Sequence, residues 1–148
     1  MKNLLNAIAE DLALNLAYLK WVKVIDSENL VPDGLEFPGV GLRDGAQSFG
    51  SLPGKKDMEQ LTVMVVPYQS LSLGTPGAAV MGDVNFKGVL DICAEIRARL
   101  NDNRFTAIFG EKIFYAHVDS FGASETLGTD EGIFIQMKRI PITYRRLS

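Results

Sequence analysis

The chain has 148 residues, of which 47% are hydrophobic and 22% are charged, and this size and composition predict one globular domain spanning residues 1–148. A formal net charge of −3 excludes a general attraction to nucleic acid or to an anionic membrane, because both need a cationic surface. The single cysteine excludes an internal disulfide, and no apolar run reaches the roughly 20 residues that span a bilayer.

The first predicted element is a helix over Leu4–Leu19, with Asn3 as its N-cap. Its apolar stripe recurs at three- and four-residue steps and consists of Leu5, Ile8, Leu12, Leu16 and Leu19. The following segment Trp21–Ile25 is short and β-branched, so it predicts the first strand. We expect the proline- and glycine-rich stretch after it to be an exposed connection.

A second short strand is expected over Val40–Arg43. The rest of the segment from Gly41 to Asp57 carries glycine at positions 41, 45, 50 and 54, which predicts a long mobile loop. Loops of this kind often carry binding residues. The next run, Glu59–Pro67, is apolar on both faces and therefore predicts an interior strand.

The clearest pattern lies in the stretch from Asp83 to Leu100, which predicts an amphipathic helix with Asp83 near its start. Arg97 and Arg99 fall in the last turn, where the helix dipole favours cations. The predicted buried face consists of Phe86, Val89, Leu90, Cys93, Ile96 and Leu100. An isolated helix of this length is marginal in water, so its apolar face must pack against other elements of the chain.

Two segments near the C-terminus predict the arms of a long antiparallel hairpin, Ile113–Phe121 and Ile133–Tyr144, joined by a small polar link. In the second arm, apolar residues occupy odd positions up to Met137 and even positions from Ile140 onward. Because strand side chains alternate, this change requires either a bulge near Lys138–Pro141 or a second half that packs against a different surface.

These elements predict an α+β domain, with a mostly antiparallel sheet of about five strands and two main helices packed on one face. We found no catalytic set in the sequence. His117 is the only histidine and lies inside an alternating strand, while Cys93 lies on the apolar face of a helix. We therefore expect no enzyme activity, no cofactor and no metal site.

The only basic cluster lies near the C-terminus and contains Lys138, Arg139, Arg145 and Arg146. It could bind an acidic partner surface or DNA phosphates. Alternatively, it is a solvated strand end whose charges discourage edge-to-edge pairing.

The order of elements resembles the tail terminator (tail completion) proteins of long-tailed bacteriophages. The resemblance runs from the N-terminal helix MKNLLNAIAEDLALNL and the strand WVKVI, through FPGVGLRDG and EQLTVMVVP, to DVNFKGVLDICAEIRARL and the closing ITYRR. It is a likeness of pattern and length and includes no diagnostic motif.

This resemblance implies a structural subunit of a homohexameric ring that caps the tail tube, ends its polymerisation and offers an attachment surface to the head connector. The implied partners are further copies of the chain, the tail tube protein and the head connector, with DNA passing through the lumen without sequence-specific binding. The implied location is the head-proximal end of the virion tail, assembled in the host cytoplasm and without a membrane. The candidate subunit or tube contacts are Arg43, Phe49, Lys55, Lys56, Arg139, Tyr144, Arg145 and Arg146.

Two alternatives stay open. The chain could be another head-to-tail connector, neck or baseplate protein, which its binding partner would distinguish. It could also be a small-molecule-binding or enzymatic α+β domain, which would require a pocket lined by His117, Tyr115 and Asp119.

Overall fold

The computed structural model describes residues 1–29, 35–52, 56–71, 76–128 and 134–147. Within these ranges the chain forms four helices and seven strands. The helices are α1 (Lys2–Asn15), α2 (Ala78–Met81), α3 (Val89–Leu100) and α4 (Thr106–Phe109). The strands are β1 (Trp21–Val24), β2 (Gly39–Leu52), β3 (Lys56–Ser70), β4 (Ile113–Val118), β5 (Glu125–Gly128), β6 (Phe134–Met137) and β7 (Ile140–Leu147). No helix in these ranges has the length and apolar character needed to cross a membrane.

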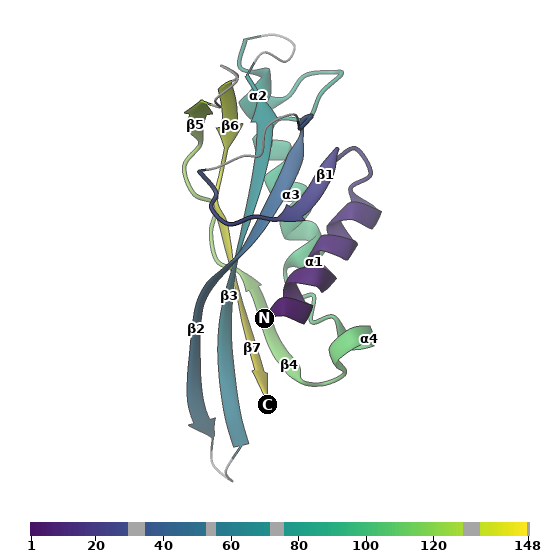
Figure 1. Cartoon of the computed structure of the whole chain (residues 1–148). Coiled ribbons are helices and arrows are strands. Elements are labelled where there is room, and N and C mark those ends of the chain that lie inside the picture. Colours follow the sequence, from purple (N-terminus) through teal and green to yellow (C-terminus); the bar gives the residue numbers. More distant parts are fainter. Residues whose placement is uncertain (30–34, 53–55, 72–75, 129–133, 148) are drawn as a thin grey trace.

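A single sheet forms the body of the domain, and the two main helices, α1 and α3, cover one of its faces (Figure 1). At one end the strand order is β1-β2-β3-β6-β5, and at the other end β7 lies beside β3 with β4 outside it. Every pair is antiparallel except β1 with β2. The predicted α+β class is therefore confirmed, and the described residues contain seven strands where the sequence predicted about five.

The predicted long loop between Gly41 and Asp57 is wrong. Strand β2 continues to Leu52 and pairs with β3 along its length, from Gly39 opposite Tyr68 to Leu52 opposite Lys56. Gly45 lies in a bulge, where an added Cβ would come 2.8 Å from the backbone oxygen of Thr62. The glycine therefore permits close approach inside a strand, a role that sequence alone does not distinguish from a loop. Residues 53–55 of the predicted loop lie outside the described residues.

The interior strand predicted at Glu59–Pro67 is confirmed as part of β3. It has β2 on one side and both β7 and β6 on the other. Its helix-facing residues Leu61, Val63 and Val65 are fully buried.

Helix α3 begins at Val89, so the predicted start at Asp83 is wrong. The carboxylate of Asp83 instead accepts hydrogen bonds from the backbone N–H groups of Asn85 and Phe86, at 2.8 and 3.0 Å, and closes a turn. Asp91 accepts the N–H of Gly88 at 3.2 Å and caps the helix. Phe86 and Leu90, which we expected on the buried face, are each 39% exposed. The rest of the predicted face is buried, together with Ile92.

The N-terminal helix is also shorter than predicted. It ends at Asn15, and Asn3 lies inside it while Met1 is its N-cap. Leu16 remains buried beyond the helix end. The guanidinium of Arg99 on α3 donates two hydrogen bonds to the carboxylate of Asp11, at 2.8 and 3.1 Å, and so links the two main helices.

The two C-terminal segments form the arms of a hairpin, as predicted, with β4 opposite β7. The expected polar link is wrong in part, because it contains strand β5, which pairs with β6. Between the two pairs, the N–H of Gly122 donates to the carbonyl of Arg139 at 2.7 Å. Residues 129–133 lie outside the described residues.

The change of apolar face in the last arm comes from packing against two different surfaces. Tyr68 pairs with Met137 and Val65 pairs with Ile140, so three steps on β3 match three steps on the other strand and no residue is inserted. Met137 packs with Trp21 and Tyr68 in one cluster, whereas Ile140 belongs to the larger cluster beneath α1 and α3. The bulge explanation is therefore wrong. The strand passes from the smaller cluster on one face of the sheet to the larger cluster on the opposite face.

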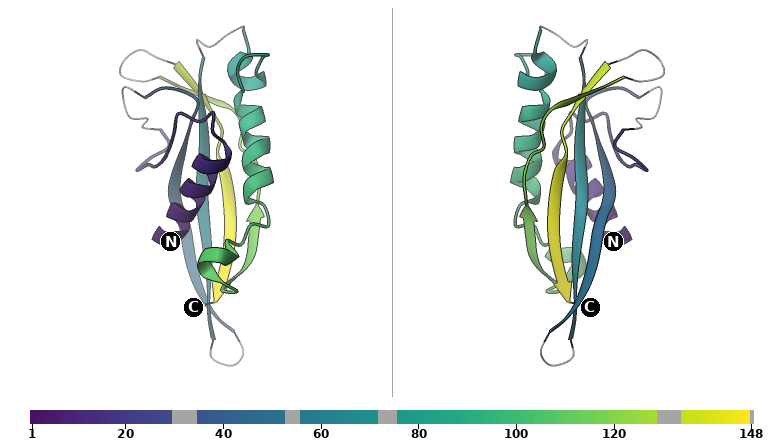
Figure 2. Two further views of the ribbon diagram at one scale, coloured as in Figure 1. Left: turned by 90° about the vertical axis from the view of Figure 1, so that its right-hand side faces the viewer. Right: turned by 90° about the vertical axis from the view of Figure 1, so that its left-hand side faces the viewer.

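The sheet is covered unevenly as a result. Figure 2 shows the helices over one face and, from the opposite side, β2, β3, β7 and β4 without a covering layer. At the β1 end, the connection after β1 carries Leu35 and Phe37, which pack against the smaller cluster. At the other end no described helix covers this side of the sheet (Figure 2).

Candidate interaction surface

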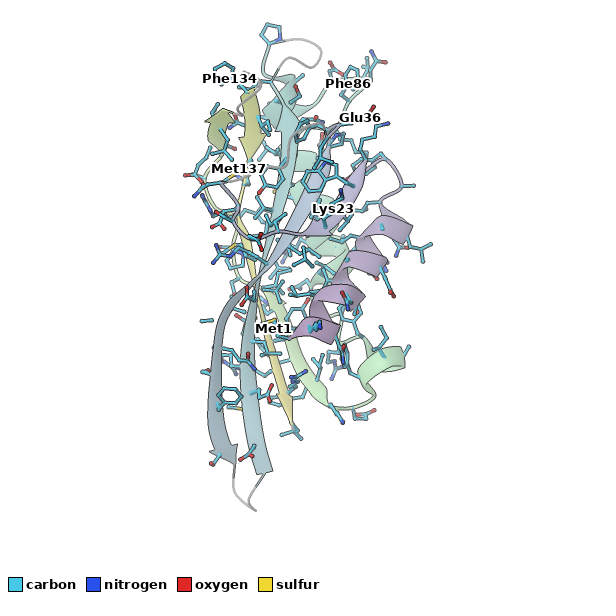
Figure 3. The ribbon with its side chains drawn as sticks, viewed as in Figure 1. Met1, Lys23, Glu36, Phe86, Phe134 and Met137 are labelled. Atoms are coloured by element: carbon cyan, nitrogen blue, oxygen red, sulfur yellow. The ribbon has the colours of Figure 1, made fainter. Side chains whose placement is uncertain are left out.

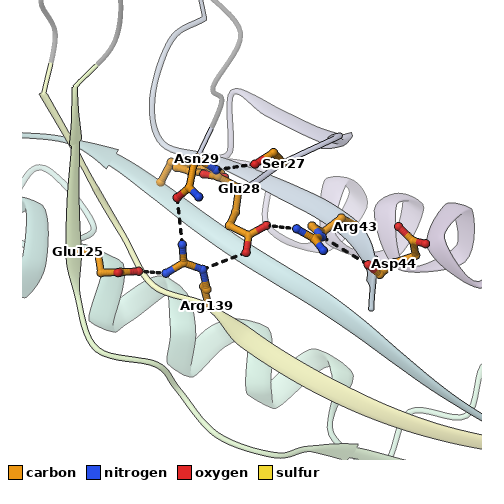
Figure 4. A network of polar contacts seen from close by, with 8 residues as sticks. Ser27, Glu28, Asn29, Arg43, Asp44, Glu125 and Arg139 are labelled. Carbon is orange, nitrogen blue, oxygen red and sulfur yellow. Dashed lines mark hydrogen bonds and ion pairs between the residues drawn. The ribbon is translucent and has the colours of Figure 1, made fainter. Parts of the chain in front are cut away.

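A polar network centred on Glu28 holds the connection after β1 against the sheet (Figure 4). The Glu28 carboxylate accepts from Nη1 of Arg43 at 2.5 Å and from Nε of Arg139 at 3.1 Å. Arg139 also donates to Asn29 at 3.0 Å and forms an ion pair with Glu125. Arg43 and Arg139, both predicted interface residues, are therefore engaged inside the chain.

The network predicts an acid-dependent loss of stability that Glu28→Gln removes. Burial raises the pKa of Glu28, but hydrogen bonds from its own backbone, Arg139 and Arg43 outweigh this effect and hold the pKa below its ordinary value of 4.5. A lowered folded-state pKa stabilises the fold above the unfolded pKa, and this contribution is lost as the pH falls through the folded value. We expect Glu28→Gln to cost about 1.5 kcal/mol at pH 7, with the difference from the wild type shrinking below about pH 4.

Urea unfolding at several pH values measures this difference. Glu36→Gln is the matched control, because Glu36 lies in the same connection and is exposed. An equal loss from both variants, or a difference that does not change with pH, would contradict the role assigned to Glu28.

The two arginines near the C-terminus are also paired within the chain. Arg145 donates to Gln60 at 3.1 Å, and its guanidinium lies 4.6 Å from the centre of the Tyr115 ring. Arg146 forms an ion pair with Glu59 at 2.8 Å. These contacts lie between neighbouring strands, so the basic cluster takes part in the sheet itself.

Tyr144 is fully buried beneath the helices and is not part of the molecular surface. Its hydroxyl oxygen is buried without a hydrogen-bond partner among the described residues. Burial, followed by the nearby charge of Asp11, raises the pKa of Tyr144. We therefore remove Tyr144 from the candidate contact residues.

Tyr144→Phe is expected to stabilise the fold by about 1 kcal/mol, because it removes a buried hydroxyl that lacks a partner. Tyr68→Phe is the control, since the Tyr68 hydroxyl donates to the carbonyl of Glu28 at 2.8 Å. That control is expected to destabilise the fold by about 1 kcal/mol. Guanidinium unfolding of both variants measures the difference, and a destabilised Tyr144→Phe would show that the hydroxyl has a partner.

Phe49 lies near the free end of the β2–β3 hairpin and is 72% exposed. Lys55, a further predicted contact, lies outside the described residues. Lys56 begins β3, and its side chain lies outside the described part of the chain. Phe49 is thus the predicted contact residue with the largest exposed apolar surface.

The uncovered side of the sheet, which we call the open face, carries half-buried side chains from three strands. Residues directly opposite one another on neighbouring strands share a face, so the pairing defines its members. They are Met58, Gln60 and Thr62 on β3, Thr143 and Arg145 on β7, and Tyr115 and His117 on β4. This mixed surface resembles the rim of a protein interface more than a hydrophobic core.

Tyr115, His117 and Asp119 follow one another on the open face rather than around a cavity. The ring centres of Tyr115 and His117 are 6.0 Å apart. The Asp119 carboxylate accepts a hydrogen bond from the hydroxyl of Thr143 at 2.6 Å. This carboxylate is thus engaged by a threonine, and the three side chains lie on β4 and on the residue that directly follows it.

The two margins of the sheet differ in how far other described residues occupy their outer sides. Beyond Leu42, β2 pairs with β3 alone, because β1 accompanies it only from Gly39 to Leu42. At the other margin, β4 pairs with β7, and the turn after α3 occupies part of its outer side. There the N–H of Asp102 donates to the carbonyl of Ala116, and the N–H of Val118 donates to Oδ1 of Asn101, both at 3.0 Å. Unpaired strand edges present rows of backbone donors and acceptors that can bind another strand.

Exposed apolar side chains gather at the end of the domain opposite the free tip of the β2–β3 hairpin. Phe86 and Phe134 both lie there (Figure 3). Figure 1 places α2 and the β5–β6 pair at this end. Val84 is 99% exposed, Met81 69% and Phe134 59%. Sequence analysis missed this end, although an isolated valine in a turn after a glycine was a visible signal.

The other reactive groups are buried or dispersed. Cys93 is fully buried, and burial raises the pKa of its thiol to about 12. Among the described residues, no three histidine, cysteine, aspartate or glutamate side chains are grouped so that they could hold a metal ion.

Comparison with known proteins gives no assignment: no family model matches this chain, and no curated protein matches it.

Proposed function

We propose that this protein is a structural subunit of a ring of the phage tail terminator type, which caps a tail tube, stops its growth and binds the head connector. In this proposal identical copies form the ring, with six as the expected number. DNA passes through the lumen without sequence-specific contacts. The proposal draws on the order of elements along the sequence and on the surfaces described above.

The observation that carries the proposal is a sheet whose β2 margin is unpaired and whose second face is uncovered. Helices α1 and α3 cover one face only, and beyond Leu42 strand β2 has no strand on its outer side among the described residues. Natural single-domain proteins usually cover or shorten such edges, because an unpaired edge can bind a strand of another chain. A subunit that assembles with copies of itself covers them through neighbouring chains.

The two ends of the domain also suit a subunit stacked between different neighbours. One end carries Met81, Val84 and Phe134, and the other carries Phe49 on the projecting hairpin. Exposed apolar side chains concentrated in this way are typical of protein contacts. A ring between a tube and a connector needs a contact surface on each of its two sides.

Multi-angle light scattering on the purified full chain tests self-assembly. The proposal predicts a discrete mass of several subunits at micromolar concentration. A strict monomer at micromolar concentration, both alone and mixed with a tail tube protein, would contradict the proposal.

A binding assay separates the tail terminator from other head-to-tail connectors. Immobilised assemblies are offered polymerised tail tube and portal-side connector rings separately. Capture of tube ends, together with shorter tubes when the protein is added during polymerisation, supports the proposed function. Binding to the portal-side ring alone would favour a neck protein instead.

A further inference from the structure

The outer side of β2 is open over the half of the strand that runs to the hairpin tip. Strand β1 leaves β2 at Leu42, whose carbonyl accepts the N–H of Ile25 at 2.8 Å. From there to Leu52, β3 is the only described strand beside β2. Residues 45–52 contain no charged side chain and no proline, the residues that usually block strand addition. This half of β2 can therefore accept another strand.

The pairing with β3 shows which backbone groups of β2 point outward. In an antiparallel ladder, successive pairs turn their backbone groups alternately toward each other and away. Leu42 turns outward and lies opposite Val65, so the residues of β2 that lie opposite every second residue of β3 also turn outward. Past the bulge that follows Asp44, these residues are Gln47, Phe49 and Ser51. We call the segment 47–51 the β2 edge.

The β2 edge is symmetric about Phe49 when it pairs with a copy of itself. If Phe49 lies opposite Phe49 of the second copy in antiparallel sense, Gln47 lies opposite Ser51 of the second copy on both sides of the centre. All three pairs then join residues that turn outward, and each such pair exchanges two backbone hydrogen bonds. The two-fold axis that relates the copies requires no other surface of the chain.

The side chain of Phe49 gives this pairing an apolar centre. It is 72% exposed in the single chain and lies in one row with Glu59 and Arg146, on the face of the sheet that carries the helices. Directly opposite side chains of an antiparallel pair lie about 5 Å apart on the same face, so the two Phe49 rings cover each other. The most exposed aromatic side chain of β2 is thus buried at the centre of the contact.

The charged groups near this seam do not oppose the pairing. The Glu59 residues of the two copies lie three strand spacings apart, about 14 Å, which exceeds the Debye length of about 8 Å at physiological ionic strength. Each Glu59 also forms an ion pair with Arg146 of its own chain at 2.8 Å. Asp57 lies opposite Ser51 on β3, and Gln47 of the second copy brings an amide group toward it. Like charges therefore do not meet across the seam.

The rest of the domain leaves room for the second copy. Figure 1 shows the free end of the β2–β3 hairpin beyond the helices. In this register the bulge of the second copy, and with it its helices, lies beyond Ser51 of the first. The two bodies therefore extend in opposite directions from the shared hairpins.

We infer that a second copy of this chain binds the β2 edge with its own β2 edge, about a two-fold axis at Phe49, so that the two sheets become one. This inference goes beyond the proposed function. A two-fold contact joins copies in pairs, so it is separate from the contact that closes a ring.

Cysteine cross-linking tests the register and keeps Phe49 in place. Gln47→Cys and Ser51→Cys are purified separately, mixed and treated with a bis-maleimide too short to join positions 47 and 51 of one chain, which lie about 13 Å apart along the strand. The inference predicts covalent dimers in the mixture and none in either variant alone. The native Cys93 is buried and does not compete.

Two further samples show whether the contact is two-fold. The double variant Gln47→Cys/Ser51→Cys should stop at the covalent dimer, because each copy has used its β2 edge; a ladder of larger multimers would overturn the inference. Gln47→Cys mixed with Leu14→Cys is the control, because Leu14 is 79% exposed on helix α1. This mixture should stay monomeric on a denaturing gel.

Charge exchange at the centre is an independent test. Phe49→Asp alone and Phe49→Lys alone place like charges opposite each other, whereas their mixture places opposite charges there. We expect the mixture to associate about tenfold more tightly than either variant alone. Analytical ultracentrifugation measures the difference, and equal association in the three samples would overturn a two-fold centre at Phe49.

The remaining outcomes separate the inference from the proposed function. Assemblies of several subunits by light scattering that give no link between positions 47 and 51 would overturn the inference and leave the proposed ring standing. Linked pairs whose mass stays at two subunits would support the inference and contradict the ring.

Discussion

Replacing Phe49 by aspartate is expected to weaken self-association at least about thirtyfold while leaving the fold intact. Phe49 is 72% exposed in the single chain, so its loss removes little buried surface from the domain. In the proposed assembly it lies on the outer margin of β2, against a neighbouring copy, where a carboxylate would lose its water without gaining a partner. Analytical ultracentrifugation over a concentration series measures the change.

The control for this experiment is Leu14→Asp. Leu14 is also apolar and is 79% exposed, but it lies on helix α1 and not on a strand of the sheet. We expect its association constant to match the wild type. If Phe49→Asp assembles like Leu14→Asp, then the outer margin of β2 does not take part in the contact that holds the copies together.

Gly88→Ala is expected to destabilise the fold by about 3 kcal/mol, near the upper end of the cost of overpacking. An added Cβ would lie 2.3 Å from the backbone oxygen of Val80 and 2.4 Å from the backbone nitrogen of Gly82. Both atoms belong to backbone, so the strain cannot be relieved by rotating a side chain. The close approach holds the end of α2 against the start of α3.

Urea unfolding measures this loss, with Gly50→Ala as its control. At Gly50 the nearest atom to an added Cβ is the Cε of Met58 at 3.6 Å, an ordinary contact. That variant should differ from the wild type by less than about 0.5 kcal/mol. Similar stability in the two variants would show that the α2–α3 contact has more space than its distances indicate.

The sequence predicted those helices and strands in which the buried residues recur with one regular spacing. The face of α3 from Val89 to Leu100 and the interior strand β3 follow directly from the spacing of their apolar residues. The start of α3 could not be predicted in the same way. Asp83 can cap a helix or close a turn, and the packing of Gly82 against Gly88 decides between these two structures.

The β2–β3 hairpin and β5 were missed for a related reason. Gly45 and Gly50 are poor strand formers in isolation, and only pairing with β3 makes their segment a strand. Tyr144 was expected among the contact residues, although its alternation with Ile140 and Ile142 already indicated the core, where the structure places it. Single-sequence patterns do not contain these long-range pairings.

The candidate surface was predicted only in part. The change of apolar face at Ile140 left a bulge and a second packing surface as explanations, and the structure shows the second. However, the basic residues expected to bind partners are paired within the chain, with Arg139 bound to Glu28 and Arg146 bound to Glu59. The unpaired margin of β2 depends on strand order, which the sequence did not predict.

Electron microscopy of the purified protein by itself tests the central claim most directly. If copies join through their sheet margins, class averages at micromolar concentration should show closed rings of uniform size with a central channel. A field that contains only single elongated particles, at concentrations where light scattering also gives the monomer mass, would contradict the account.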